Sequence, residues 1–156
     1  MQDSAAVQAF WNRARAAVPE LPEPLPEAWA FGATPEHADG LLALVLAGVK
    51  TGTASSMRDY ETSGDTVPEE GELSVILDGT ERPRAVIRTT ELVVVPFDRV
   101  TAEHARSEGE GDRSLSHWRA VHERYWREHS ENPRGFAPDM PVLCERFEVV
   151  YRERDA

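Results

Sequence analysis

The segment Arg84–Val95 constrains the fold more than any other part of the chain. It is rich in β-branched residues, which pack well on a pleated strand and lose side-chain freedom in a helix, so it predicts a long β-strand. Two further segments predict strands: Glu72–Leu77, before the turn residues Asp78-Gly79, and Val142–Tyr151. The core is therefore expected to be a β-sheet or a β-barrel.

Helices are predicted in the segments that flank these strands. Asp3–Val18 carries apolar residues at helical spacing, and a second helix is expected to begin after its cap Thr34 and to end at Gly48. Between the last two strands we expect a short helix capped by Thr101 and a longer helix over Ser114–His129. A chain of 156 residues with this order of elements predicts one α+β domain.

The N-terminal part differs from the rest in composition. Its first helix is followed by residues 19–32, which hold four prolines and predict a surface linker. The first twenty residues lack the basic start and apolar middle of a signal peptide, and no apolar run is long enough to span a bilayer. We therefore expect a cytoplasmic protein that does not enter a membrane.

The charge of the chain restricts its partners. The formal net charge is -11, and affinity for long nucleic acids comes largely from basic residues that neutralise phosphates. Long duplex DNA is therefore not an expected partner, whereas a compact ligand or a short single strand held locally is compatible with this charge.

Lysine usage singles out one residue. Of the 17 basic residues only Lys50 is a lysine, and it lies where the second helix ends. Arginine can replace lysine in most surface roles, but its guanidinium stays charged, whereas an amine can lose its proton and act as a base. Either Lys50 is retained because its amine is needed, or a coding bias has spared it by chance.

The surrounding residues favour the first interpretation, because they resemble a known family. Gly48-Val49-Lys50-Thr51-Gly52-Thr53 resembles the Gly-x-Lys-x-x-Thr core of the ASCH family. Downstream segments in the same order and spacing are similar to the YhfF-like branch of that family: Ile87–Glu91, Val95–Phe97, Glu108–Leu115 with Trp118, and Cys144–Phe147. The similarity extends from about Phe31 to Tyr151.

This resemblance implies a fold and a division of the chain. ASCH domains belong to the PUA-like superfamily, so the expected fold is a PUA-like β-barrel with flanking helices. Residues 1–30 would then form an N-terminal helix and proline-rich linker, and residues 31–156 the ASCH domain.

The resemblance also implies a cleft for RNA or modified nucleosides, with two alternative chemistries. In the branch that hydrolyses the amide of N4-acetylcytidine, the catalytic lysine, threonine and glutamate would correspond to Lys50, Thr53 and Glu91. In members that act as ribonucleases on single-stranded RNA, Lys50 would supply the cation and Glu91 or His117 the base. A non-catalytic RNA-binding module is the third possibility. Of the three, we expect the ribonuclease.

Further residues are candidate substrate contacts. The family core often has an arginine two positions after the threonine, whereas this chain has Ser55. Ser55 itself is a candidate contact, and Arg58 is a candidate replacement for the arginine. The remaining candidates are Thr51, Asp112, Arg113, Ser114 and Trp118, of which Trp118 could stack on a base or belong to the core.

No cofactor is firmly expected. The acidic group Glu108, Glu110 and Asp112 could recruit a divalent ion such as Mg²⁺ or Mn²⁺, but a solvated acidic loop is the more common outcome. The histidines are scattered, and Cys144 is alone, so neither residue type predicts a protein-held metal site.

Overall fold

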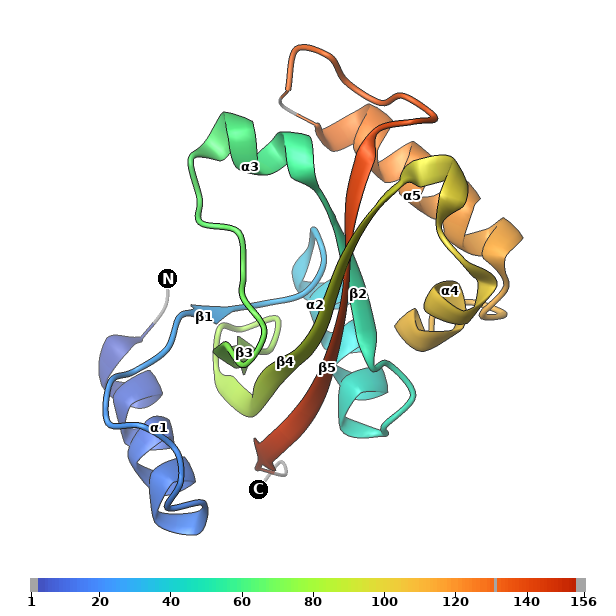
Figure 1. The fold of residues 1–156 in the computed structure, drawn as a ribbon. Helices are drawn as coiled ribbons and strands as arrows, with labels where there is room; N and C mark the ends of the chain where they lie inside the picture. Colours follow the sequence, from blue (N-terminus) through green and yellow to red (C-terminus); the bar gives the residue numbers. More distant parts are fainter. Residues whose placement is uncertain (1–2, 131, 154–156) are drawn as a thin grey trace.

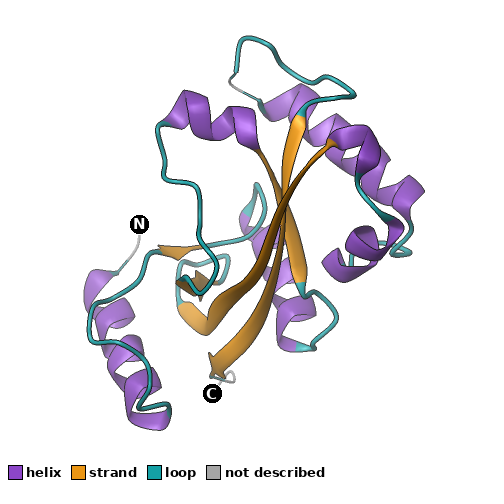
Figure 2. Ribbon diagram, viewed as in Figure 1, coloured by secondary structure: helices purple, strands orange, loops and turns teal. Residues whose placement is uncertain are grey.

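The computed structural model describes residues 3–130 and 132–153, so the last three residues of the expected domain lie outside the described part of the chain. Its helices are arranged around one sheet that its strands form (Figures 1 and 2). In order, the elements are α1 (Ser4–Ala17), β1 (Ala28–Trp29), α2 (Pro35–Leu46), β2 (Gly52–Ser56), α3 (Met57–Ser63), β3 (Leu73–Leu77), β4 (Pro83–Pro96), a 3₁₀ turn (Phe97–Arg99), α4 (Ala102–Glu108), α5 (Leu115–His129) and β5 (Pro141–Arg152).

One twisted sheet connects all of these elements. The described strands follow the order β1-β3-β4-β5-β2, with β1 parallel to β3 and every other pair antiparallel. The long strands β4 and β5 form its spine, with irregular register between Val86 and Ile87 and again between Thr89 and Glu91, and such bulges increase the local twist (Figure 1). Within the described residues the edge strands β1 and β2 do not pair, so the sheet is a partial barrel.

The structure confirms the predicted α+β class and PUA-like architecture. Side-chain caps set several helix starts as expected: Thr34, Thr101 and Ser114 each accept a hydrogen bond from a backbone N–H of the first helical turn. The three long strand segments also form strands.

The 3₁₀ turn and the strand β2 were not predicted, and neither were two further short elements, α3 and β1. Helix α3 buries no residue, so it lacks an apolar stripe, although it ends at Gly64 in the left-handed conformation (φ 77°). Strand β1 has only two residues and lies within the segment 19–32 that was expected to be a surface linker; it forms because this part of the segment pairs with β3. Both depend on tertiary contacts that leave little trace in local sequence.

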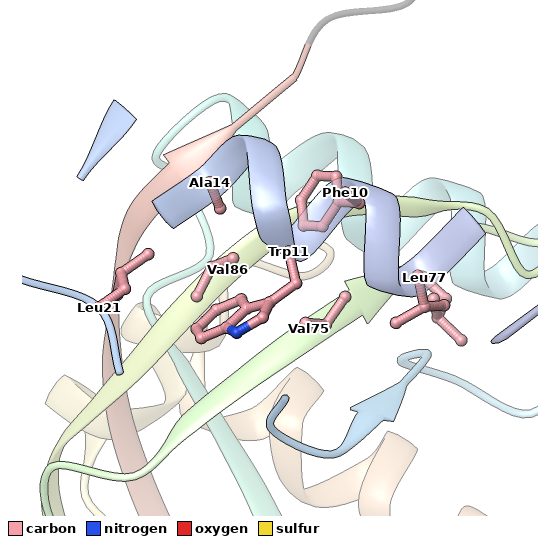
Figure 3. Close-up of a cluster of buried hydrophobic side chains, with 8 residues drawn as sticks. Phe10, Trp11, Ala14, Leu21, Val75, Leu77 and Val86 are labelled. Atoms are coloured by element: carbon pink, nitrogen blue, oxygen red, sulfur yellow. The ribbon is translucent and has the colours of Figure 1, made fainter. Parts of the chain in front are cut away.

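Helix α1 packs on one end of the sheet. Its buried residues Phe10, Trp11 and Ala14 contact the cluster that includes Val75 of β3 and Val86 of β4 (Figure 3). The indole nitrogen of Trp11 donates a hydrogen bond to the backbone oxygen of Glu23, which ties the proline-rich segment to the helix (3.1 Å). Among the described residues there are two other clusters of buried hydrophobic side chains. One lies beneath α2, and the other lies between α5 and the far ends of β4 and β5.

No helix among the described residues combines the length and apolar character that a membrane-spanning segment requires.

We expect Trp11→Ala to lower the free energy of unfolding by about 3–5 kcal/mol, because a fully buried indole leaves a cavity. The neighbouring exposed residue offers a control, Asn12→Ala, which should change stability by less than about 0.5 kcal/mol. Urea unfolding followed by fluorescence or circular dichroism measures both. Equal stability of the two variants would show that α1 does not contribute to the core.

Candidate functional site

Lys50 lies at a junction that buries its side chain. Helix α2 ends before Gly48, whose positive φ (77°) turns the chain, and Lys50 then leads into β2. The side chain is only 2% exposed. Burying an ammonium group without hydrogen-bond partners would cost several kcal/mol, so its surroundings must satisfy it.

The amine of Lys50 is surrounded by oxygen atoms. Its Nζ donates to the backbone oxygen of Gly52 (2.9 Å) and lies 3.4 Å from the backbone oxygen of Glu108. Two carboxylates are also within ion-pairing distance, Glu108 Oε1 at 3.7 Å and Glu110 Oε2 at 3.5 Å. One wall is apolar, since the ring centroid of Phe31 is 5.4 Å from Nζ.

The C-terminal end of α4 brings these carboxylates to the lysine. A backbone hydrogen bond from Thr51 N to Ser107 O (2.7 Å) joins this end to the start of β2. Gly109 adopts φ 74°, and a Cβ atom there would lie 2.9 Å from the backbone oxygen of Val49. Only glycine permits this close approach in the left-handed region.

Glu108 is the centre of a buried polar network. It is 2% exposed, and its Oε2 accepts hydrogen bonds from His104 Nε2 (2.7 Å) and Trp118 Nε1 (2.5 Å). His122 Nε2 lies 3.4 Å from the other carboxylate oxygen, and the His122 ring stacks on Trp118.

These partners keep Glu108 ionised. Burial would raise the pKa of its carboxyl, but the hydrogen bonds from His104 and His122 and the charge of Lys50 outweigh burial and place the pKa well below its usual range. In return, Glu108 raises the pKa of His122 against the effect of burial. The network therefore holds one fixed negative charge beside the amine.

Two adjoining cavities open next to this network. The smaller, about 150 Å³, is lined by Lys50, Thr53, Glu108 and His122 among others. The larger, about 620 Å³, extends between the sheet and the loops after β1 and α3, and shares Phe31, Thr53 and Tyr125 with the smaller one. Thr53 therefore lies at the boundary, within reach of ligands in either space.

The larger cavity is acidic. Its lining includes Glu27, Asp65, Glu72 and Glu145, and no lysine or arginine of the described chain lines it. Burial, together with the charge of Glu72, raises the pKa of Glu145 to about 7, although a hydrogen bond from Thr89 acts in the opposite direction. The pKa of Glu72 is also raised, by partial burial and by Glu27 and Glu69.

Comparison with known proteins places this chain in a family. The family model described as ASCH domain matches residues 27–151, which is most of the chain. The chain belongs to the ASCH domain family. This domain is a PUA-like fold of a type that binds RNA.

Solved structures agree with the assignment. Protein EF3133 from Enterococcus faecalis V583 is 34% identical, with 93% of this chain and 88% of that chain covered and a TM-score of 0.83. An ASCH domain from Lactobacillus crispatus JV V101 is 25% identical, with 96% of both chains covered and a TM-score of 0.85. No curated protein sequence matches the chain.

Three of the residues expected from the ASCH resemblance lie at the cavities. Lys50 and Thr53 line the smaller space, and Ser55 lines the larger one, where it accepts a hydrogen bond from the Tyr60 hydroxyl (3.2 Å). Thr51 is exposed and contributes its backbone groups to pairing. Glu91 is exposed on β4 beside a register shift and lines neither cavity, whereas Glu108 occupies the position next to Lys50.

The other expected contacts lie elsewhere. Arg58 donates from Nη1 to the backbone oxygen of Gly135 (3.5 Å), so it does not take the place of the missing family arginine. Trp118 is buried and holds Glu108, so it is a core residue and offers no face for a base.

The segment Asp112–Ser114 joins α4 to α5 and lines neither cavity. Asp112 accepts a hydrogen bond from Ser114 N (2.9 Å), Ser114 caps α5, and Arg113 donates to the last turn of α4 through Arg106 O (3.1 Å). Among the described residues, no group of three or more His, Cys, Asp or Glu side chains is arranged to hold a metal ion.

Sequence reasoning considered Glu108 only as a possible ligand of a divalent ion and did not single out Glu145. Glu108 left a signal, because His104 and Glu108 are four residues apart on one helix and Trp118 and His122 are four apart on the next. Glu145 left a weaker one: it alternates with Leu143 and Phe147 on β5, a polar residue on an otherwise apolar buried face.

We expect Glu145→Gln to stabilise the protein increasingly as pH rises. The folded pKa of Glu145 is raised from 4.5 to about 7, so its stabilising contribution is complete below about 4.5 and is lost as pH rises through 7. The loss in the wild type is on the order of 3 kcal/mol, and a permanently neutral glutamine avoids it. Urea unfolding at pH 5 and pH 8 gives the difference, and a constant difference would mean that Glu145 is already ionised at pH 5.

Proposed function

We propose that this ASCH domain hydrolyses the amide bond of a modified nucleoside of the N4-acetylcytidine type. The observation that carries the proposal is that Thr53 and the buried Lys50 line the same small cavity, and that Thr53 also lines the larger cavity, where no described arginine or lysine does. A hydroxyl next to a desolvated amine is a known arrangement for nucleophilic catalysis.

The chemistry follows from these two side chains. The Lys50 ammonium first loses a proton to water, and the Thr53 oxygen then attacks the amide carbonyl carbon while its own proton passes to the free amine of Lys50. The resulting ammonium lies beside the developing oxyanion and returns the proton to the leaving amine as the C–N bond breaks. Water then attacks the acyl-threonine while Lys50 takes a proton from it, and Lys50 returns this proton to the Thr53 oxygen as the ester C–O bond breaks and the carboxylic acid is released.

Glu108 takes the role of the third residue. It is held ionised by His104, Trp118 and His122, so it fixes the Lys50 side chain and is not suited to carry protons itself. A positioned amine loses less entropy when it reaches the transition state. The carboxylate that the family resemblance assigned to Glu91 is therefore assigned here to Glu108.

The charge of the cavity favours a neutral ligand. A ribonuclease must attract a phosphodiester and stabilise a phosphorane, which requires cationic groups at the phosphate. The larger cavity offers Glu27, Asp65, Glu72 and Glu145, and the amine of Lys50 is already flanked by two carboxylates. These features support a nucleoside over an RNA chain as the substrate.

The size and walls of the cavity also fit a nucleoside. Small-molecule sites commonly measure about 300–1,000 Å³, and the volume here is about 620 Å³. Its aromatic lining residues, Trp29, Phe31, Tyr60 and Tyr125, provide surfaces for a planar base.

We expect purified protein to convert N4-acetylcytidine to cytidine and acetate, measured by liquid chromatography. Lys50→Arg keeps a positive charge but removes the base, and should lower kcat by about 10²–10⁴-fold. Thr53→Val removes the nucleophile and should lower kcat at least as much. Binding without turnover would make the domain a binding module, and cleavage of single-stranded RNA by the same preparation would instead support a ribonuclease.

A pair of conservative variants separates the two carboxylates. Glu108→Gln should lower kcat by about 10–100-fold, because Lys50 loses the charge that positions it, whereas Glu91→Gln should leave kcat within about twofold. Thermal melting of both variants checks folding, since Glu108 is buried. Loss of activity in Glu91→Gln alone would restore the assignment made from the sequence.

A further inference from the structure

A second buried carboxylate faces the cavity beside Thr53. Glu145 on β5 lies directly opposite Thr53 on β2 in the antiparallel register, and both line the larger cavity. Residues directly opposite in such a pair have Cβ atoms about 4.5–5.5 Å apart and project to the same face. A ligand group next to the Thr53 hydroxyl is therefore also next to Glu145.

The surroundings of Glu145 differ from those of Glu108. Glu145 is 7% exposed, yet its hydrogen bond within the described chain is a long one from Thr89 Oγ1 (3.4 Å), and no described cation lies within ion-pairing distance. Glu108, in contrast, has three nitrogen donors and a neighbouring ammonium. Buried polar groups are normally hydrogen-bonded, so most of the bonding capacity of Glu145 is open to a ligand.

The neighbouring groups define what such a ligand looks like. Ser74 and Thr89 add hydroxyl groups to the same cavity, and Trp29 and Tyr60 add aromatic surface. Flat walls favour a planar ring, and a carboxyl at the floor favours a ring edge with polar atoms. A carboxylic acid group presents one donor and one acceptor side by side.

We propose that Glu145, in its protonated form, recognises the edge of a nucleobase-type ring on which a hydrogen-bond donor and an acceptor are adjacent. The acid donates to the ring acceptor and accepts from the neighbouring N–H, while Thr89 keeps the carboxyl in place. In an N4-acylated cytosine this edge is the ring nitrogen N3 with the amide N–H. Recognition there directs the acyl carbonyl toward Thr53, so Glu145 is a specificity-determining residue.

The protonated form is accessible because Glu145 lies in acidic, desolvated surroundings. Burial and the charge of Glu72 raise its pKa to about 7. Titratable groups from every surrounding segment line the same or the adjoining cavity: Glu27 before β1, His37 of α2, Tyr60 of α3, Asp65 after α3, Glu72 before β3, Glu108 at the end of α4, Glu110 after α4, and His122 and Tyr125 of α5. Lys50 is in the adjoining cavity and is paired with Glu108 and Glu110.

Binding of cytidine to the full chain tests the proposal without requiring turnover. The inference rests on the proposed function in taking a nucleobase as the ligand, but cytidine carries no scissile amide, so its binding does not depend on Thr53 chemistry. Calorimetry between pH 6 and pH 9 should show wild-type affinity falling by about tenfold per pH unit above 7. If the protein shows this pH profile of cytidine binding but does not hydrolyse N4-acetylcytidine, the proposed function is wrong and the role of Glu145 in binding is still supported.

Three variants make the assignment specific. Glu145→Gln keeps a neutral donor and acceptor, so cytidine should bind with an affinity that no longer changes with pH. Glu145→Ala removes both groups and should weaken binding by at least about tenfold at pH 6. Glu148→Gln, an exposed carboxylate on the same strand, should behave as the wild type.

Three outcomes would overturn the proposal. The first is a pH dependence of binding that persists in Glu145→Gln, which would assign the pH dependence to another group such as His122. The second is a wild-type affinity that does not change with pH. The third is no cytidine binding by folded wild-type protein. Circular dichroism at each pH establishes that the variants are folded.

Discussion

The burial of one ammonium group governs the arrangement of this ASCH domain. Lys50 is placed between the end of α2 and the start of β2, and its amine is satisfied by Gly52, Glu108 and Glu110. A charge buried to this extent is tolerated only with close partners, so the end of α4 must reach the lysine. The left-handed Gly109 and the backbone bond between Thr51 and Ser107 meet that requirement.

The residues around Glu108 are needed because Glu108 is buried next to Lys50. The negative charge beside Lys50 is itself buried, and α5 supplies the indole of Trp118 and the imidazole of His122 that stabilise it. Trp118 also stacks on Phe97 in the cluster between α5 and the strand ends, and the His122 ring stacks on Trp118. Core packing and site electrostatics are thus provided by one set of residues, and changes in this core are expected to alter the position of the amine.

The sheet gives the cavities two carboxylates with opposite properties. Glu108 lies on a helix end with many donors and stays ionised, whereas Glu145 lies on a strand whose neighbours are hydroxyls and other acids, and its pKa rises to about 7. Environments that separate the behaviour of two carboxyl groups are typical of sites in which each has its own role. In the proposed reaction Glu108 positions the general base Lys50, and Glu145 forms hydrogen bonds with the edge of the nucleobase.

The sequence by itself determined the long strands and the capped helices, and it singled out Lys50 and Thr53, which line the same cavity. These features depend on local rules, namely β-branched runs, Thr and Ser caps, and one short motif after a helix. Only the tertiary structure decided which carboxylate pairs with Lys50. Glu91 and Glu108 are both acidic residues downstream of the motif, but of the two only Glu108 lies within ion-pairing distance of Lys50, whereas Glu91 is exposed. The tertiary structure also decided that Trp118 is core and that Glu145 faces Thr53, because the register between β2 and β5 joins segments some ninety residues apart and no local pattern encodes it.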